Sequence, residues 1–500
     1  MRACRKLCLA LCVGGLLLPA DCGKHPQPPA APSNGHAAGP RPDIVLISID
    51  TLRPDHLGCY GYARDTSPNI DRLASEGTLF ETAISSSSWT LPAHAALFTG
   101  LADSVHGAVE TDRVLAADRK TLAERLRAAG YRTVGFFSGP TLYPAFGLGQ
   151  GFDTYVDCTS YPELSAAAAQ RAGIEIGSPL QMASMEDVTS ERIYAGVQSW
   201  LNENAGDPAA ASAPFFLFIH MWDPHFDFIP PPPYDTRFDP DYTGSATGRN
   251  FIFDKTVCAA MPKRDLEHII ALYDGEIAWT DLHVGKILAD LAAGGRRAST
   301  LVVLLSDHGT EFFEHQSKGH RQTLFDEVIR IPLIVCWPGH VPAGRRIADQ
   351  VRIIDVLPTI MQLAGLPPPD DVMGQSLVPL LNGAPLAGDT LAVSELYSLG
   401  RAFRAFRRPD RKLIRHELSG TSIVFNLRAD PGEQRPVQDP TNILFQAALK
   451  DARRGDGWLA EFRDRLPISP AAPLLPDRVR QRLENLGYIE RQEKDQADKP

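Results

Sequence analysis

Consecutive apolar residues, many of them β-branched, recur along the chain as short runs bounded by polar or turn-forming residues. They occupy positions 43–50, 132–137, 215–220, 300–306 and 332–335. An unbroken apolar run of this length is typical of a strand that is buried on both faces, as the strands of a parallel sheet are. The pattern therefore predicts a central, mostly parallel sheet that contains these strands.

Segments with a helical period lie between the apolar runs. Residues 68–76 follow Ser67, which we expect to act as an N-cap, and they stop at Gly77. Residues 120–129 and 265–293 also end at a glycine. Because strands alternate with helices, we predict the α/β class, in which helices flank both faces of the central sheet.

Composition divides the chain into four regions. An apolar leader over 1–21 precedes a stretch rich in Pro, Ala and Gly over 22–42, which we expect to be a disordered linker. The alternating strands and helices fill residues 43–393, the predicted catalytic domain. We interpret residues 394–500 as a smaller C-terminal α+β lobe. The basic run at 401–412 is interpreted as a solvated face rather than a binding patch.

The leader has the layout of an export signal. A basic start is followed by 12 apolar residues, Leu7 to Leu18, a length too short to span a bilayer and typical of a signal-peptide core. In one interpretation the chain is a lipoprotein, and a lipid on Cys22 tethers it to a membrane. Ordinary cleavage after Ala20 is the alternative. Both predict an exported protein of the periplasm or cell envelope.

The net charge argues against nucleic acid as a partner, and the cysteine spacing argues against a zinc site built from cysteines. The formal net charge is -10, and the sequence has no basic stripe of the kind that binds nucleic acid. Outside the leader region, Cys59, Cys158, Cys258 and Cys336 show no CxxC spacing. A zinc site built from cysteines is therefore not expected.

Polar residues end two of the predicted strands. Asp50 closes the first run, and Asp307 with His308 follows the run at 300–306. Ligands of open α/β sheets bind just beyond the carboxyl ends of the strands. An Asp at a strand end can simply cap a turn, but two carboxylates and an imidazole together are a donor set for a divalent cation. We predict a metal site here, with the proline-rich loop 224–250 as its rim.

Thr90 stands where a serine-rich loop enters a predicted helix. Free backbone N–H groups and the helix dipole at such a position favour a tetrahedral anion. A threonine hydroxyl is a weak nucleophile unless a metal or a base lowers its pKa. Thr90 is therefore a candidate nucleophile beside the predicted metal site, and a plain N-cap is the structural alternative.

The chain resembles the sulfatase family of the alkaline phosphatase superfamily. The resemblance rests on four segments, which are 43–61 (DIVLISIDTLRPDHLGCYG), 88–100 (SWTLPAHAALFTG), 215–232 (FFLFIHMWDPHFDFIPPP) and 306–338 (SDHGTEFFEHQSKGHRQTLFDEVIRIPLIVCWP). It implies an alkaline-phosphatase-like sandwich and the hydrolysis of sulfate or phosphate esters. The substrate would be a small molecule or an ester of a glycan or lipid.

Carried over position by position, the resemblance implies three sets of site residues. The metal ligands would be Asp50, Asp307, His308 and Thr90, and Thr90 stands where the family keeps its nucleophile. The catalytic residues would be Thr90, His225 and His320, and the substrate-binding residues would be His94, Lys318 and Arg321. His225 would contact the anionic oxygens of the substrate or protonate its leaving group. Among the neighbouring candidates for similar work, we favour His320.

The chain also departs from the family pattern. Sulfatases place Cys or Ser at the position of Thr90, oxidise it to formylglycine, and have Arg where this chain has His94. Oxidation of a threonine would give a ketone, so the formylglycine route is closed. Thr51 replaces a second carboxylate and His308 replaces an Asn. The set resembles phosphoethanolamine and glycerol-phosphate transferases, and the histidine favours zinc or manganese over calcium.

Three functional hypotheses follow. The first is a metal-dependent hydrolase that cleaves sulfate or phosphate esters through Thr90, with phosphoesters favoured by Thr90 and His308. The second is a phosphotransferase that moves a head group onto an envelope glycan or lipid. The third is an inactive exported binding protein on a sulfatase scaffold, against which the retained metal-ligand positions argue.

Overall fold

The computed structural model describes residues 41–159, 188–205, 213–468, 472–485 and 487–489. The leader, Cys22 and all but the last two residues of the predicted linker lie outside this part of the chain. The export signal and the lipid tether therefore stay predictions. Within the described residues, no helix is both long and apolar enough to cross a membrane.

The central sheet has eight strands in the order β10-β2-β9-β6-β1-β5-β3-β4. β9 runs antiparallel to both of its neighbours, and the other neighbouring pairs are parallel. The strands are β1 (Asp43–Ile49), β2 (Thr78–Ile84), β3 (Arg132–Phe137), β4 (Thr154–Asp157), β5 (Phe215–Met221), β6 (Thr300–Ser306), β9 (Arg330–Cys336) and β10 (Arg345–Arg352). The mostly parallel α/β sheet that the sequence predicted is confirmed.

The predicted strands are those with the most uniform burial. β1, β5 and β6 are buried at every residue, which is why they read as unbroken apolar runs. By contrast, β10 has the sequence RRIADQVR and several exposed side chains, since it lies at the edge of the sheet. A polar edge strand has no continuous apolar signal, so the pattern did not indicate it.

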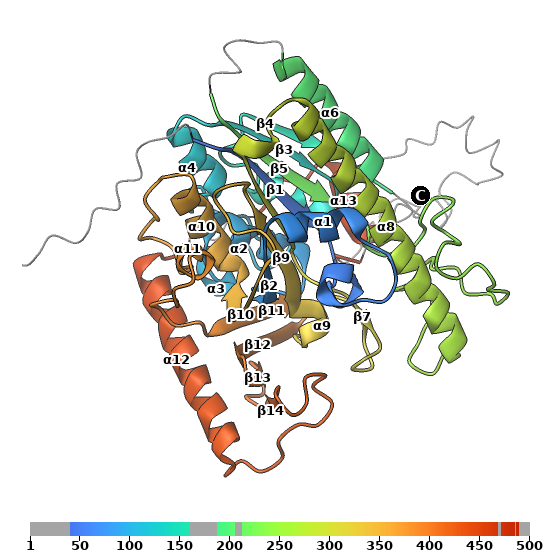
Figure 1. The fold of residues 1–500 in the computed structure, drawn as a ribbon. Helices are drawn as coiled ribbons and strands as arrows, with labels where there is room; N and C mark the ends of the chain where they lie inside the picture. The colour runs from blue at the N-terminus through green and yellow to red at the C-terminus, as the bar shows by residue number, and fades with distance from the viewer. Residues whose placement is uncertain (1–40, 160–187, 206–212, 469–471, 486, 490–500) are drawn as a thin grey trace, which may run out of the picture. The chain divides into compact units, whose positions relative to one another are not determined.

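Helices cover both faces of this sheet (Figure 1). α8, the longest, packs against α6 and α1, while α2 contacts α3, α4 and α10. The helices are α1 (Pro68–Glu76), α2 (Thr90–Thr99), α3 (Asp103–His106), α4 (Leu122–Ala128), α6 (Ser190–Ala205), α8 (Lys263–Ala293), α9 (Asp326–Ile329), α10 (Val356–Leu363), α11 (Val378–Leu381), α12 (Ile443–Arg465) and α13 (Asp477–Asn485). Short 3-10 turns are η1 (Pro54–His56), η2 (Gly58–Tyr60), η3 (Pro140–Leu142), η4 (Pro144–Phe146), η6 (Arg297–Ser299) and η7 (Ile353–Asp355).

Helix ends follow local sequence with one difference. Thr121 accepts from the backbone N–H of Glu124 in a full capping box at the start of α4. Ser67 stands at the N-cap position of α1, but its hydroxyl donates to Asp71 Oδ1 at 3.0 Å instead of accepting from the helix backbone. The predicted position of the cap is confirmed, although the Ser67 side chain makes no capping hydrogen bond.

A second, antiparallel sheet forms near the end of the chain, and α12 packs against it. Its strands are β11 (Ala392–Ser398), β12 (Arg401–Arg408), β13 (Arg411–His416) and β14 (Ser422–Asn426), and a separate hairpin pairs β7 (Glu311–Phe312) with β8 (Lys318–Gly319). Arg404, Arg407 and Lys412 are buried in ion pairs. The interpretation of this basic run as a solvated face is therefore wrong for these three cations.

Candidate active site

Three neighbouring strands end together at one edge of the central sheet. β1 lies between β5 and β6, and the parallel register sets Ile49 beside Met221 and Ser306. The residues that follow each strand therefore emerge side by side. This register brings Asp50 to Asp307 and His308, although the two sequence segments are far apart.

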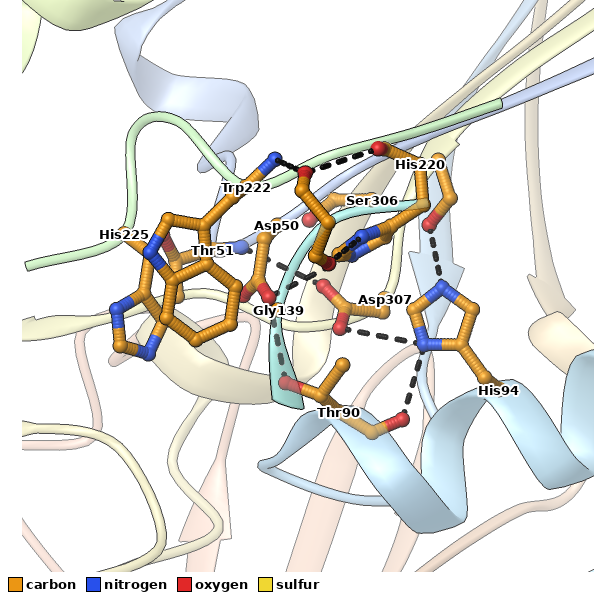
Figure 2. Close-up of polar contacts among 12 residues, drawn as sticks. Asp50, Thr51, Thr90, His94, Gly139, His220, Trp222, His225, Ser306 and Asp307 are labelled. Atoms are coloured by element: carbon orange, nitrogen blue, oxygen red, sulfur yellow. Dashed lines mark hydrogen bonds and ion pairs between the residues drawn. The ribbon is translucent and has the colours of Figure 1, made fainter. Parts of the chain in front are cut away.

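Thr90 completes this group from the other side. It is the first residue of α2, whose N-terminus points toward the strand ends (Figure 2). Its Oγ1 donates to Asp50 Oδ2 at 3.3 Å and lies 3.3 Å from His308 Nε2. All four side chains are fully buried. The predicted metal ligands and the predicted nucleophile thus converge at one point.

The two carboxylate oxygens of Asp307 differ in their hydrogen bonds. Oδ1 accepts from the backbone N–H of His308 at 2.8 Å and from that of Thr51 at 3.4 Å. Oδ2 has no hydrogen-bond donor within the described chain, and it lies 3.4 Å from His308 Nε2. The backbone therefore fixes the carboxylate plane and leaves one oxygen free for a ligand.

Burial raises the pKa of both carboxyl groups. Desolvation raises the pKa of Asp50 to about 7, and it also raises the pKa of Asp307, to which the nearby Asp50 charge adds. Asp50 Oδ1 also lacks a donor among the described residues. Two buried, incompletely paired carboxylates and an imidazole nitrogen within 4.8 Å of one another fit a divalent cation. The donor chemistry thus agrees with the predicted metal site.

A second group of side chains, formed by His225, His320 and Tyr488, lies next to the predicted metal ligands. The Tyr488 hydroxyl lies 3.0 Å from His225 Nε2 and 3.3 Å from His320 Nε2. The ring of His320 lies 4.6 Å from that of His308, which connects this group to the predicted metal ligands. Burial holds the pKa of both His225 and His320 well below the usual value, which favours the neutral form of each ring.

The predicted substrate-binding residues occupy three different settings. His94 lies one helical turn below Thr90, where its Nδ1 donates to the Thr90 carbonyl at 2.9 Å and its Nε2 accepts from Ser48 at 3.0 Å. Lys318 Nζ donates to the carbonyls of Asp254 and Val257 at 2.8 and 2.7 Å. This geometry favours positioning roles for both residues over the predicted contact with substrate.

Arg321 remains close to the site through aromatic contacts. Its guanidinium lies 4.2 Å from the ring of Trp89 and 4.6 Å from that of Tyr488. Its Nη2 also donates to Glu110 at 3.0 Å. The cation is therefore held beside the start of α2, with its charge partly balanced.

Sequence reasoning did not identify two residues at the site. His220 closes the predicted apolar run of β5 and pairs with Ser48 near the end of β1, and this position was the available signal. Tyr488 follows α13 near the end of the chain and reaches His225 only through the tertiary fold. Nothing in its local sequence indicates such a contact.

Comparisons with known proteins place this geometry in a family. Residues 42–366 match the Sulfatase family, and residues 314–451 match the family described as "N-sulphoglucosamine sulphohydrolase, C-terminal". The chain is 27% identical over 469 residues to the N-acetylgalactosamine-6-sulfatase of Canis lupus familiaris, covering 81% of this chain and 83% of that protein. It is 26% identical over 387 residues to the arylsulfatase of Clostridium perfringens, covering 68% and 78%.

A solved structure shares the fold at lower identity. The phosphonate monoester hydrolase of Agrobacterium radiobacter superposes with a TM-score of 0.67 at 22% identity, over 84% of this chain and 96% of that one. Because the sulfatase match spans most of the chain and includes the strand ends described above, the resemblance seen in the sequence is confirmed. The chain belongs to the sulfatase family of ester hydrolases, within the alkaline phosphatase superfamily.

Proposed function

We propose that this protein is a metal-dependent hydrolase of phosphate or sulfate esters with Thr90 as its nucleophile, and that phosphoesters are preferred. One observation carries the proposal. The Thr90 hydroxyl lies at the start of a helix, 3.3 Å from both Asp50 Oδ2 and His308 Nε2. A hydroxyl in this setting has a carboxylate to take its proton and a helix N-terminus to face an anion.

Asp50, Asp307, His308 and the Thr90 hydroxyl would hold one divalent cation. When bound, the cation would lower the pKa of the Thr90 hydroxyl and stabilise negative charge on the transferring group. The histidine nitrogen favours zinc or manganese over calcium, because calcium prefers oxygen ligands. Asp50 Oδ1 and Asp307 Oδ2, which have no hydrogen-bond donor among the described residues, support the binding of a cation by these carboxylates.

The reaction would proceed in two steps. In the first, Thr90 Oγ1 bonds to phosphorus or sulfur while the bond to the leaving alcohol oxygen breaks. Asp50 Oδ2, to which the hydroxyl already donates, takes the Thr90 proton. In the second step, water attacks the covalent Thr90 ester, the bond to Oγ1 breaks, and Thr90 recovers its proton from Asp50.

His225, Tyr488 and His320 would serve the leaving group. The Tyr488 hydroxyl lies 3.0 Å from His225 Nε2 and 3.3 Å from His320 Nε2, so it connects the two imidazole rings. A proton from this network would go to the leaving oxygen in the first step. The network would regain a proton from the attacking water in the second.

The choice of phosphorus over sulfur rests on two residues. Thr90 cannot become the formylglycine that family sulfatases use, and His308 adds a nitrogen ligand in place of an amide. The named relatives include sulfatases, whereas a structural neighbour is a phosphonate monoester hydrolase. Both ester classes therefore belong in the test.

The test measures turnover of 4-nitrophenyl phosphate monoesters, diesters, phosphonate monoesters and sulfate, with zinc, manganese or calcium supplied. The wild type is compared with Thr90→Ala and with Thr99→Ala. Thr99 is a matched control, because it is equally buried at the other end of α2 and its hydroxyl donates to the Ala95 carbonyl. A phosphodiesterase or phosphonate activity that only Thr90→Ala abolishes is expected.

Other outcomes separate the alternatives. Sulfate turnover that survives Thr90→Ala would contradict the assignment of the nucleophile. No turnover of any ester, together with tight metal binding, would favour the inactive scaffold. Transfer of the group to an added alcohol faster than to water would favour the phosphotransferase.

A further inference from the structure

Three buried histidines surround the carboxylates of Asp50 and Asp307, and each ring directs Nδ1 at a backbone carbonyl. The pairs are His94 with Thr90 O at 2.9 Å, His220 with Ser138 O at 2.7 Å, and His308 with Gly309 O at 2.9 Å. A carbonyl oxygen can only accept, so Nδ1 carries the hydrogen in every case. The Nε2 of each neutral ring is consequently an acceptor.

The three Nε2 atoms face different partners. His94 Nε2 has the hydroxyl of Ser48 at 3.0 Å, which can donate to it. His308 Nε2 faces the Thr90 hydroxyl and the free oxygen of Asp307. His220 Nε2 has no hydrogen-bond donor within the described chain, although the side chain is fully buried, and it lies 3.5 Å from Asp50 Oδ2 (Figure 2).

Two acceptors that face each other in a buried setting repel, and each loses its hydration. Such an arrangement is destabilising unless a proton or a cation lies between the lone pairs. A shared proton would draw the two atoms to within about 3.2 Å, which is closer than the observed 3.5 Å. Ligand atoms about 2.0–2.1 Å from a tetrahedral zinc ion are roughly 3.4 Å apart, which matches the observed separation of His220 Nε2 and Asp50 Oδ2. The backbone carbonyl on Nδ1 is also the usual partner of a metal-bound histidine.

We propose that His220 is an additional ligand of the active-site cation and binds it through Nε2. This inference rests on the proposed metal-dependent function and adds to its ligand set. His220 also lies close to Asp307, since a nitrogen of its ring is within 4.8 Å of a carboxylate oxygen of that residue. The cation would then have nitrogen donors from two histidines.

The added ligand compensates for a missing one. Thr51 occupies the position where the family has a second carboxylate, and its hydroxyl donates to the Pro224 carbonyl at 3.1 Å. That side chain therefore makes a structural hydrogen bond elsewhere. His220, from the neighbouring strand end, supplies a neutral nitrogen in place of a charged oxygen. The exchange makes the site less anionic and better suited to zinc or manganese than to calcium.

A second cation between His94, His220 and Asp307 is the competing arrangement, because these three residues also gather within ligand distance. The hydrogen on His94 Nδ1 argues against it. That nitrogen is the one nearest to Asp307 Oδ2, at 3.5 Å, but it donates to the Thr90 carbonyl. His94 therefore offers no lone pair on this side, and it serves as a matched control for His220.

The experiment titrates metal-free protein with Co²⁺ and follows its visible absorption, with bound metal counted by elemental analysis. The wild type is compared with His220→Gln, His220→Ala and His94→Gln. We expect one Co²⁺ per wild-type chain. Both His220 variants should bind at least about 10-fold to 100-fold more weakly and show an altered cobalt spectrum. His94→Gln should keep the wild-type spectrum, and imidazole added to His220→Ala should restore part of the lost affinity.

Thermal unfolding guards against a folding defect. The metal-free His220 variants should unfold cooperatively, and the stabilisation that Co²⁺ adds should be smaller than in the wild type. The inference is overturned if wild type and His220→Gln share one affinity and one spectrum, or if the wild type binds two ions and His94→Gln loses one. Failure of the proposed function looks different, because wild-type protein would then bind no stoichiometric metal.

Discussion

Buried charge gathers in two regions of this molecule, and the two are arranged in opposite ways. Next to the second sheet, Lys412 Nζ lies 2.9 Å from both Asp326 and Glu433, and Arg407 pairs with Asp326 at 2.7 Å. At the end of the central sheet, Asp50 and Asp307 have carboxylate oxygens with no donor among the described residues. The first cluster balances its own charges, whereas the second does not.

The pKa of Asp326 differs from that of Asp50 in the direction that this contrast predicts, whereas burial and the Asp326 charge raise the pKa of Glu433 within the first cluster. Burial would raise the pKa of Asp326, but Arg407 and Lys412 outweigh it and hold that pKa below the ordinary value. Burial raises the pKa of Asp50 to about 7 because its neighbours do not compensate. A balanced buried cluster serves the structure, whereas an unbalanced one is a candidate for binding a cation and a substrate.

Removing a charge from the unbalanced cluster should have the largest effect. Asp307→Asn is expected to lower turnover by on the order of 10³-fold or more, because a metal ligand is lost. The same change should stabilise the metal-free protein by roughly 1–3 kcal/mol, because a buried unpaired charge is removed. Activity assays and thermal unfolding after chelation measure both effects, and a less stable metal-free variant would contradict this view of the cluster.

Removing a charge from the balanced cluster should do the reverse. Lys412→Met leaves Asp326 and Glu433 with one cation fewer, so we expect a loss of about 3–5 kcal/mol of unfolding free energy. Turnover at low temperature should stay within a few-fold of wild type. Arg411→Met is the control, since its ion pair with Asp451 is partly exposed and should contribute at most about 1 kcal/mol. Chemical denaturation measures the difference.

Glu311 is another buried carboxyl group without a compensating partner in the described chain, and its effect on the stability of the protein should depend on pH. It is fully buried, neither of its carboxylate oxygens has a hydrogen-bond partner among the described residues, and burial raises its pKa to about 8. A raised pKa means that folding favours the protonated form, so its contribution is complete below about pH 4.5 and is lost as pH rises to 8. Glu311→Gln should therefore match wild type near pH 4.5.

At pH 9 the same variant should be more stable than wild type, by up to about 4 kcal/mol. Denaturation curves at several pH values measure the difference. Equal stability of the two proteins at pH 9 would show that the ionised carboxylate finds a partner.

The smallest effect is expected in the group formed by His225, His320 and Tyr488. Tyr488→Phe removes the hydroxyl between His225 and His320 and keeps the aromatic packing against Trp89. The loss of one hydrogen-bonded relay should lower kcat by roughly 3-fold to 10-fold and leave metal affinity unchanged. A change in metal affinity would show that the group of His225, His320 and Tyr488 is coupled to the proposed metal ligands.

The sequence was sufficient where a signal is local and periodic. Asp50 and Asp307 were predicted to lie together because each follows a buried run, and parallel strands end at one edge. Thr90 was predicted at a helix start, and it is the first residue of α2. His220 shared the same strand-end signal, but the apolar run that contains it was interpreted only as core.

Other features depend on tertiary contacts that no local pattern encodes. The polar edge strand β10 lacks an apolar run, and the burial of Arg404 becomes visible only when Glu395 and Asp456 are placed beside it. His94 was expected to contact substrate, since a helix position alone does not reveal which side of the turn meets the strand. Tyr488 reaches the site from a distant segment.

The side-chain contacts that hold α2 against the end of β1 affect the entropy of the proposed reaction. Ser48 and Asp50 point to one face of the strand, and His94 and Thr90 lie one turn apart on the helix. The two pairs meet at 3.0 and 3.3 Å. A slip of one residue in either element would break both contacts together. The Thr90 hydroxyl, which we propose as the nucleophile, is thus preorganised during folding, so little orientational freedom remains to be lost when a substrate binds.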